Sequence, residues 1–213
     1  MSEYLSEITA LLIEGDFQQI AQVTRSALDS GISASDVLNQ GLMPGMDHIG
    51  VEFKAGRVFV PEVLRSAKAM QESMDIIRPI LAETGAKPVG KIVLGTVKGD
   101  LHDIGKNLVG MMCEGAGFEV TDLGKNVDPQ AFIDAVNELE PDIIGMSALL
   151  TTTMISMDRT IQALVEAGVR DQVIVLVGGA PVNHDFAEKI SADGYAPNAA
   201  EAADLAKELI SKR

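Results

Sequence analysis

The 213-residue chain is predicted to be an α/β protein: an N-terminal helical bundle that serves as a cap, followed by a doubly wound, flavodoxin-like domain with a five-stranded parallel sheet. Two observations predict this. Up to residue 86, apolar residues recur at steps of three and four, which is the period of a helix. From residue 87 onward, short apolar runs alternate with longer amphipathic segments, as in βαβ units. We therefore expect a helical domain over residues 1–86 and an α/β domain over residues 87–213.

Local signals mark the helices of the first part. Residues 17–28 place apolar side chains on one face, and Gly31 is positioned to end that helix. Ser33 and Asp36 have the spacing of a capping pair, and Pro44-Gly45 disturbs the helix that follows. Pro61 suits the first turn of a further helix. The apolar face of that helix, called here the seam, has residues that recur at steps of three and four: Val63, Ala67, Met70, Met74, Ile77 and Leu81. Residues 84–88 are polar, contain glycine and proline, and are the predicted linker.

The second part has the strand and helix pattern of a parallel sheet. We expect strands at residues 92–94, 119–121, 143–146 and 173–177, with a short one at Tyr195. We expect helices at about 104–115, 129–139, 154–167, 183–191 and 199–211. Ligands of such sheets bind at the carboxyl ends of the strands, near the point where the strand order reverses.

Composition excludes several classes of partner. The formal net charge is −14 and the isoelectric point about 4.5, so nucleic acids and anionic membranes would be repelled. Cys113 is the one cysteine, which leaves no disulfide framework and no thiolate cluster. The first residues lack a basic segment followed by an apolar run, and no stretch approaches the roughly 18 apolar residues of a spanning helix. We therefore expect a cytoplasmic protein.

Three turns that follow predicted strands carry residues suited to binding. The first contains Asp100-x-His102-x-x-Gly105, the second begins Ser147-Ala148-Leu149, and the third is Gly178-Gly179. Because the carboxyl ends of parallel strands meet at one edge, a histidine, a carboxylate, hydroxyls and bare glycine backbone should converge there. On their own these turns predict a sizeable ligand site and nothing more specific.

Together, the three turns resemble the signature of cobalamin-binding domains that hold the cofactor base-off with a histidine ligand. The intervals also resemble that signature, with 41 residues (106–146) between the first two turns and 28 (150–177) between the last two. Residues 41–46 and 59–63 are similar to the helical cap module of methionine synthase and of small corrinoid proteins that serve methylamine, methanol, betaine and aryl methyl ether demethylation. Residues 196–199 are similar to the last loop of those proteins, near the nucleotide tail.

The resemblance assigns expected roles. His102 would be the axial cobalt ligand, Asp100 would accept the other ring N–H, and Ser147 would extend that relay. The glycines would let the cofactor tail approach the backbone, and Phe59 and Val63 would lie on the contact face of the cap. No catalytic residue is expected. The full cofactor-binding set is Asp100, Leu101, His102, Asp103, Ile104, Gly105, Ser147, Leu149, Thr151, Gly178, Gly179, Ala196, Asn198, Phe59 and Val63.

The function implied by the resemblance is that of a corrinoid methyl carrier with no turnover of its own. It would carry a methyl group on cobalt between a substrate-specific methyltransferase and a second one with a tetrahydrofolate-type or thiol acceptor, and a reductive activase would be a further partner. Methylated amines or betaines are the first expected substrates, and methoxylated aromatics or methanol the second. Two alternatives are the small cobalamin-binding subunit of a carbon-skeleton mutase, which needs no bundle, and a cobalamin-dependent sensor, which needs an output module.

Overall fold

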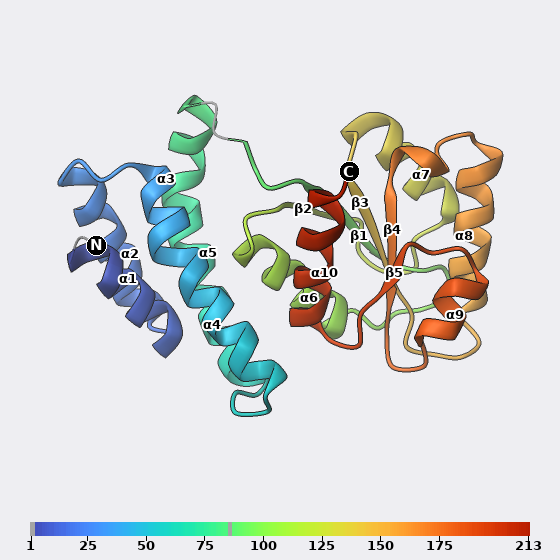
Figure 1. Cartoon of the computed structure of the whole chain (residues 1–213), viewed down its shortest axis with the longest axis horizontal. Coiled ribbons are helices and arrows are strands. Elements are labelled where there is room, and N and C mark those ends of the chain that lie inside the picture. Colours follow the sequence, from blue (N-terminus) through green and yellow to red (C-terminus); the bar gives the residue numbers. More distant parts are fainter. Residues whose placement is uncertain (1–2, 85–86) are drawn as a thin grey trace. The chain divides into compact units, whose positions relative to one another are not determined.

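The computed structural model describes residues 3–84 and 87–213 and divides into two compact units (Figure 1). The first takes in the chain up to Pro88, and the second consists of Val89–Glu114 and Phe118–Arg213. Part of the predicted linker, residues 85–86, lies outside the described residues, as does the predicted boundary at residue 86, which stays a prediction. Within the described ranges, no helix has both the length and the apolar character needed to cross a membrane.

The first unit is helical, as predicted. It contains α1 (Glu3–Glu14), α2 (Phe17–Asp29), α3 (Ala34–Asp36), the π-helical turn η1 (Val37–Leu42), α4 (Met43–Lys54) and α5 (Val60–Thr84). Gly31 lies just after α2 with a φ of +92°, a conformation that glycine adopts without strain. The capping pair is confirmed, because Ser33 Oγ accepts the Asp36 N–H at 3.0 Å and donates to its carboxylate at 2.7 Å.

The predicted disturbance near Pro44 takes the form of a π-helical turn. Pro44 lies in the first turn of α4, which continues directly from the π-helical turn, and it supplies no N–H to the helix at that point. In the preceding π-helical turn, the Gly41 carbonyl accepts a 2.7 Å hydrogen bond from Thr9 on α1. On α5, Val63, Ala67, Met70 and Ile77 of the predicted seam are buried, while Met74 and Leu81 are half-buried.

The second unit is the predicted α/β domain. Its strands are β1 (Lys91–Thr96), β2 (Glu119–Asp122), β3 (Ile143–Ser147), β4 (Ile174–Gly178) and β5 (Gly194–Tyr195). All pairs are parallel, in the order β2-β1-β3-β4-β5. The helices are α6 (Ile104–Gly115), α7 (Pro129–Leu139), α8 (Ile155–Glu166), the short η2 (Arg170–Gln172), α9 (His184–Lys189) and α10 (Ala199–Ser211). The strand order reverses between β1 and β3, so their loops diverge at that point and leave room for a ligand.

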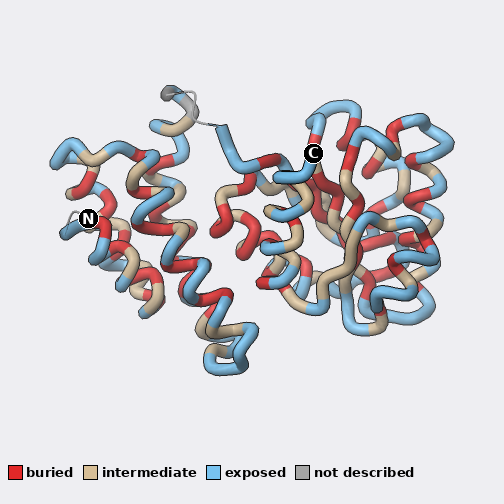
Figure 2. Tube along the Cα trace, viewed as in Figure 1, coloured by how far each residue is buried: buried red, intermediate tan, exposed pale blue. Residues whose placement is uncertain are grey.

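Helices cover both faces of this sheet. Figure 1 shows α6 and α10 on one face and α7, α8 and α9 on the other, and Figure 2 shows the buried strands between them. On the α7 side, Phe132 is fully buried and its ring lies where a side chain at Gly95 would project, 2.6 Å from the Cβ position. Cys113 on α6 is also buried, and burial raises the pKa of its thiol to about 12, as for a cysteine that packs in a core. The sheet is thereby held rigid beneath its carboxyl edge.

Candidate functional site

The β1–α6 loop presents a histidine at the carboxyl edge of the sheet. After β1 ends, the chain turns back so that the Asp100 N–H donates to the Val97 carbonyl at 3.1 Å, with Gly99 at a φ of +87°. His102 follows, two residues before α6 begins, and its side chain is 52 % exposed. A tight turn and a helix start therefore fix both ends of a short segment that carries an accessible imidazole.

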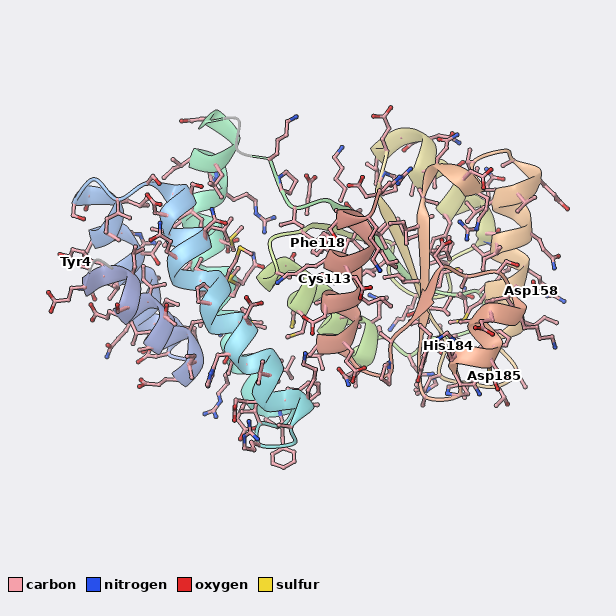
Figure 3. The ribbon with its side chains drawn as sticks, in the orientation of Figure 1. Tyr4, Cys113, Phe118, Asp158, His184 and Asp185 are labelled. Atoms are coloured by element: carbon pink, nitrogen blue, oxygen red, sulfur yellow. The ribbon has the colours of Figure 1, made fainter. Side chains whose placement is uncertain are left out.

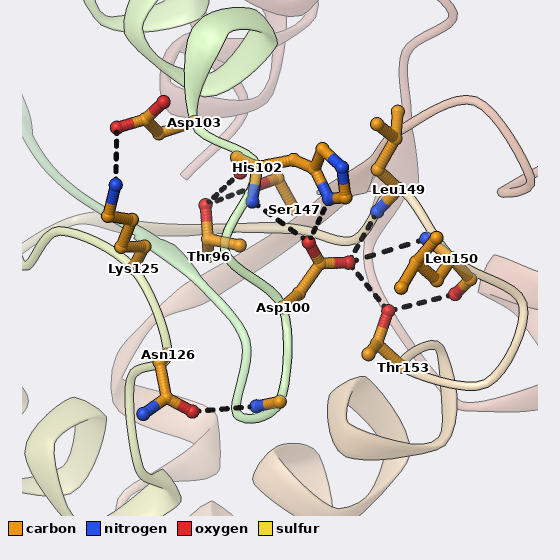
Figure 4. A network of polar contacts seen from close by, with 11 residues as sticks. Thr96, Asp100, His102, Asp103, Lys125, Asn126, Ser147, Leu149, Leu150 and Thr153 are labelled. Atoms are coloured by element: carbon orange, nitrogen blue, oxygen red, sulfur yellow. Dashed lines mark hydrogen bonds and ion pairs between the residues drawn. The ribbon is translucent and has the colours of Figure 1, made fainter.

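The Asp100 carboxylate is buried and accepts five hydrogen bonds (Figure 4). Oδ1 accepts the backbone N–H of His102 at 3.0 Å and its Nδ1 at 2.8 Å. Oδ2 accepts the N–H groups of Leu149 and Leu150, at 2.8 and 3.3 Å, and the Thr153 hydroxyl at 2.6 Å. Burial by itself raises the pKa of Asp100, but the bonds from Thr153, His102 and Leu149 outweigh it, so the pKa lies below its ordinary value. The group is an anion at neutral pH.

This carboxylate determines which nitrogen of His102 is free. An ionised carboxylate is an acceptor only, so Nδ1 must carry the proton that the 2.8 Å contact shares. In the neutral imidazole, a proton on Nδ1 leaves the lone pair on Nε2, which is the arrangement that metal-ligating histidines show. The other histidines differ. His48 belongs to α4 in the helical unit, and His184, labelled in Figure 3, is 78 % exposed and lies 3.7 Å from Glu188 on its own helix.

The Ser147 hydroxyl pairs with Thr96 on the neighbouring strand. The Thr96 hydroxyl donates its one proton to the His102 carbonyl at 2.9 Å, so Ser147 must donate to Thr96, 2.9 Å away. The hydroxyl on the Asp100 carboxylate belongs instead to Thr153, which is buried. Among the described residues Ser147 makes no hydrogen bond to Asp100, and the part expected of Ser147 in the relay stays a prediction. The run Thr151-Thr152-Thr153 was the available signal, but the sequence does not show which threonine faces inward.

Apolar side chains are exposed in the β1–α6 and β3–α8 loops and at the first residues of the two helices that follow them. The set, called here the apolar edge, is between 43 and 75 % exposed and consists of Leu101, Ile104, Leu149, Leu150 and Ile155. Exposed apolar groups that gather in this way mark a surface that binds something. Leu101, Ile104 and Leu149 belong to the predicted cofactor-binding set, whereas Leu150 and Ile155 do not. Thr151 is also exposed, and the Asp103 carboxylate lies 3.8 Å from Lys125 Nζ.

The glycines of the three turns differ in how much space surrounds their Cβ positions. A Cβ at Gly105 would meet no atom within 4 Å, and one at Gly178 would come no closer than 3.4 Å to Ala196 O. Gly179 has a φ of +128°, and a Cβ there would lie 1.9 Å from the Ala148 carbonyl oxygen. The fold itself therefore requires glycine at 179, whereas Gly105 leaves space that a ligand can use.

The remaining predicted residues lie further along the chain or in the other unit. Ala196 and Asn198 are half-buried in the β5–α10 loop, where Asn198 caps α10 by accepting the Glu201 N–H at 2.9 Å. Phe59 is exposed and Val63 is fully buried. Both belong to the helical unit, and their part in the site stays a prediction.

Comparisons with known proteins identify the family. A B12 binding domain family matches residues 90–204, and a second B12 binding domain family matches residues 4–78. A corrinoid protein of Desulfitobacterium hafniense is 41% identical over 211 residues, which cover 98% of each chain. This chain belongs to the corrinoid protein family. Trimethylamine corrinoid protein 1 of Methanosarcina acetivorans is 38% identical to this corrinoid protein over 210 residues, 98% of this chain and 97% of that one.

A solved structure is similar to the corrinoid protein over its full length. The methanol:cobalamin methyltransferase complex MtaBC from Methanosarcina barkeri contains a chain with a TM-score of 0.88 and 30% identity, and the match covers 100% of this chain and 81% of that chain. The α/β unit with the Asp100–His102 network coincides with the longer of the two matched B12 binding domains.

The two glycines after β4 should respond differently to alanine. In the corrinoid protein, Gly179→Ala should lower the free energy of unfolding by about 2 kcal/mol or more, because it forces a strained backbone and a clash with Ala148. Gly178→Ala, the matched control, should change it by less than about 1 kcal/mol, because the added methyl meets only ordinary contacts. Urea unfolding followed by circular dichroism measures both. Equal losses would contradict the assignment.

Asp100→Asn should be destabilising in a pH-dependent way. The asparagine side chain replaces one carboxylate oxygen by an NH₂ group, which must then face N–H or O–H donors and cannot bond to them. We therefore expect the free energy of unfolding to fall by roughly 3 kcal/mol at pH 7. The pKa of Asp100 is lower in the folded than in the unfolded state. The ionised carboxylate therefore contributes its full stabilisation to the fold above the unfolded pKa of about 4, and this stabilisation is lost as the pH falls below that value. The difference in the free energy of unfolding between wild type and variant should thus be about 1 kcal/mol smaller at pH 3 than at pH 7. Urea unfolding at both pH values tests this, with the exposed Asp171→Asn as control; a gap that is constant with pH would refute it.

Proposed function

We propose that this corrinoid protein holds its cofactor base-off through His102 and carries a methyl group between two methyltransferases. The observation that carries the proposal is the state of the His102 ring. Its Nδ1 is bonded to a buried, anionic carboxylate, and its Nε2 stands free on a half-exposed side chain. A residue that had only a packing role would have no need of either feature.

The residues around His102 fit a corrinoid. Such a group is a broad, largely apolar ring with a central metal, and the apolar edge offers exposed aliphatic side chains beside the imidazole. Gly105, three residues after His102, has open space at its Cβ position, as a loop that a bulky ligand approaches would need. His102 would supply the lower axial ligand, while Leu101, Ile104 and Leu149 would contact the ring.

When bound, the corrinoid supplies a cobalt centre that can accept a methyl group and give it up. The protein's own part is to hold the imidazole. Asp100 keeps the proton on Nδ1 and makes Nε2 a better donor to a metal. The bonds from Leu149, Leu150 and Thr153 keep the carboxylate ionised and in place. Once covered by a corrinoid, the aliphatic side chains of the apolar edge would exclude water from the surroundings of His102.

Methylated amines are the proposed source of the methyl group. The trimethylamine corrinoid protein is 38% identical along nearly all of both chains, against 30% for the chain in the methanol:cobalamin complex, and this supports an amine first and methanol second. A substrate-specific methyltransferase would load the protein, and a second one, with a thiol or tetrahydrofolate-type acceptor, would unload it. We further propose a reductive activase as a partner.

The axial ligand can be tested directly. Reconstituted wild-type protein should bind about one corrinoid per chain and, with the cobalt reduced to Co(II), show electron paramagnetic resonance coupling to one imidazole nitrogen. His102→Ala should lose that coupling and retain the corrinoid more than about 10-fold less well, since a ligand contributes at least as much as its hydrogen-bonding partner. His184→Ala is the matched control and should behave as wild type. Coupling to the benzimidazole nitrogen in the wild type would reject the assignment.

The carrier role predicts a dependence on added corrinoid protein. With a trimethylamine methyltransferase, a thiol-methylating partner and a reducing system supplied, transfer of labelled methyl from trimethylamine to the thiol should require the wild-type protein, and His102→Ala should not replace it. Methanol with its own methyltransferase is the comparison substrate. Transfer at the same rate without the corrinoid protein would refute the role, and transfer from methanol alone would reassign the substrate.

A further inference from the structure

The β2–α7 loop, residues 123–128, lies along the segment that leads into the histidine loop. The Leu123 N–H donates to the Leu94 carbonyl at 2.8 Å, and the Thr96 N–H donates to the Gly124 carbonyl at 2.9 Å. The Val127 N–H then donates to the Thr96 carbonyl at 2.9 Å. Backbone pairing thus continues beyond the end of β2, and the two loops form one structural unit.

Asn126 makes two hydrogen bonds to the turn that precedes His102. Its backbone N–H donates to the Asp100 carbonyl at 3.0 Å, and its side-chain Oδ1 accepts the Gly99 N–H at 2.8 Å (Figure 4). Asn126 has a φ of +56°, in the left-handed region. Glycine, asparagine and aspartate tolerate that region best, and of these only the last two bring an acceptor oxygen. The position therefore demands both an unusual backbone and a carbonyl-like side chain.

Two ion pairs flank this contact. Lys125 lies 3.8 Å from the Asp103 carboxylate, and Lys98 pairs with Asp128. All four side chains are at least 38 % exposed, so each pair contributes little in water. The ion pairs follow the line of contact between the loops, but the two bonds of Asn126 are the ones that reach the main chain of Asp100.

A buried lysine anchors the start of the same loop. The Lys106 side chain is 2 % exposed, and its Nζ lies 2.5 Å from Asp122 Oδ2 and 2.7 Å from Asn107 Oδ1. The other Asp122 oxygen accepts the Gly124 N–H at 2.8 Å. A buried cation needs such partners, and removing one would leave an uncompensated charge. The loop that carries Asn126 is therefore fixed to α6 at one end and to β1 along its length.

We propose that Asn126 is a positioning residue for His102. By holding the peptide groups of Gly99 and Asp100, it sets where the Asp100 carboxylate stands, and the carboxylate in turn orients the imidazole. Asn126 acts through Asp100. The meaning of that orientation for cobalt rests on the proposed function, whereas the positioning itself is a property of the protein.

Three variants separate the roles of backbone and side chain. Asn126→Gly keeps the left-handed backbone accessible and removes the acceptor for Gly99. Asn126→Asp keeps the left-handed backbone and an acceptor oxygen, so it should behave as wild type. Glu140→Gly is the matched control, because Glu140 is also left-handed, with a φ of +48°, but caps the far end of α7.

Amide hydrogen exchange in protein without added corrinoid gives the first readout. In Asn126→Gly the Gly99 amide should exchange about 10-fold faster, the equivalent of one lost hydrogen bond. The deciding amides are those of His102 and Leu149, which both donate to the Asp100 carboxylate. Their exchange should rise at least about 3-fold in Asn126→Gly and stay at wild-type rates in the other two variants.

The second readout uses corrinoid-loaded protein. Asn126→Gly should weaken the imidazole coupling of Co(II) and release the corrinoid about 10-fold faster, the size expected when support for a metal ligand is lost. Should Asn126→Gly fail to fold by circular dichroism, Asn126→Ser removes the acceptor in its place, because its hydroxyl is shorter than the amide. It also strains the left-handed backbone, so its control is Glu140→Ser, which puts the same residue at the other left-handed position.

The outcomes are distinguishable. Faster exchange at Gly99 alone, with His102, Leu149 and the imidazole coupling unchanged, would overturn the positioning role. Lack of imidazole coupling in the wild type would instead remove the proposed function, and the exchange rates at His102 and Leu149 would still decide whether Asn126 positions the loop.

Discussion

The site depends on one buried anion. The Asp100 carboxylate has no lysine or arginine among its hydrogen-bond partners and is stabilised by backbone N–H groups, a hydroxyl and an imidazole. These partners come from the β1–α6 and β3–α8 loops, about fifty residues apart in the chain. Because a buried carboxylate must keep such partners, neither loop can shift without a large cost in free energy. The position of His102 follows from this constraint.

Most of the α/β fold could be predicted, because its signals are local. The helices over 104–115, 129–139 and 199–211 have the predicted bounds, since a breaker or capping residue lies at each start, as Asn198 does before α10. The convergence of the three turns also follows from topology, because parallel strands bring their carboxyl ends to one edge.

What could not be predicted is set by side-chain direction and backbone conformation. Ser147 at the end of β3 and Thr153 in the loop after it are both hydroxyl residues, and only the turn through Leu149 and Leu150 decides which reaches Asp100. Asn126 gave no signal, because Lys125-Asn126-Val127 reads as an ordinary loop and the left-handed φ is invisible in the sequence. The adjacent glycines at 178 and 179 look equivalent in the sequence, yet an added Cβ would lie 1.9 Å from a backbone carbonyl oxygen at 179 and 3.4 Å from one at 178.

The apolar edge also has a consequence for how the chain behaves in a crowded cell. A newly made copy displays five aliphatic side chains that are 43 to 75 % exposed, a surface prone to sticking to other copies. The net charge of −14 opposes this, because like-charged molecules repel before such surfaces meet. The acidity of the chain thus acts as colloidal protection, because it disfavours association between copies through this exposed apolar surface.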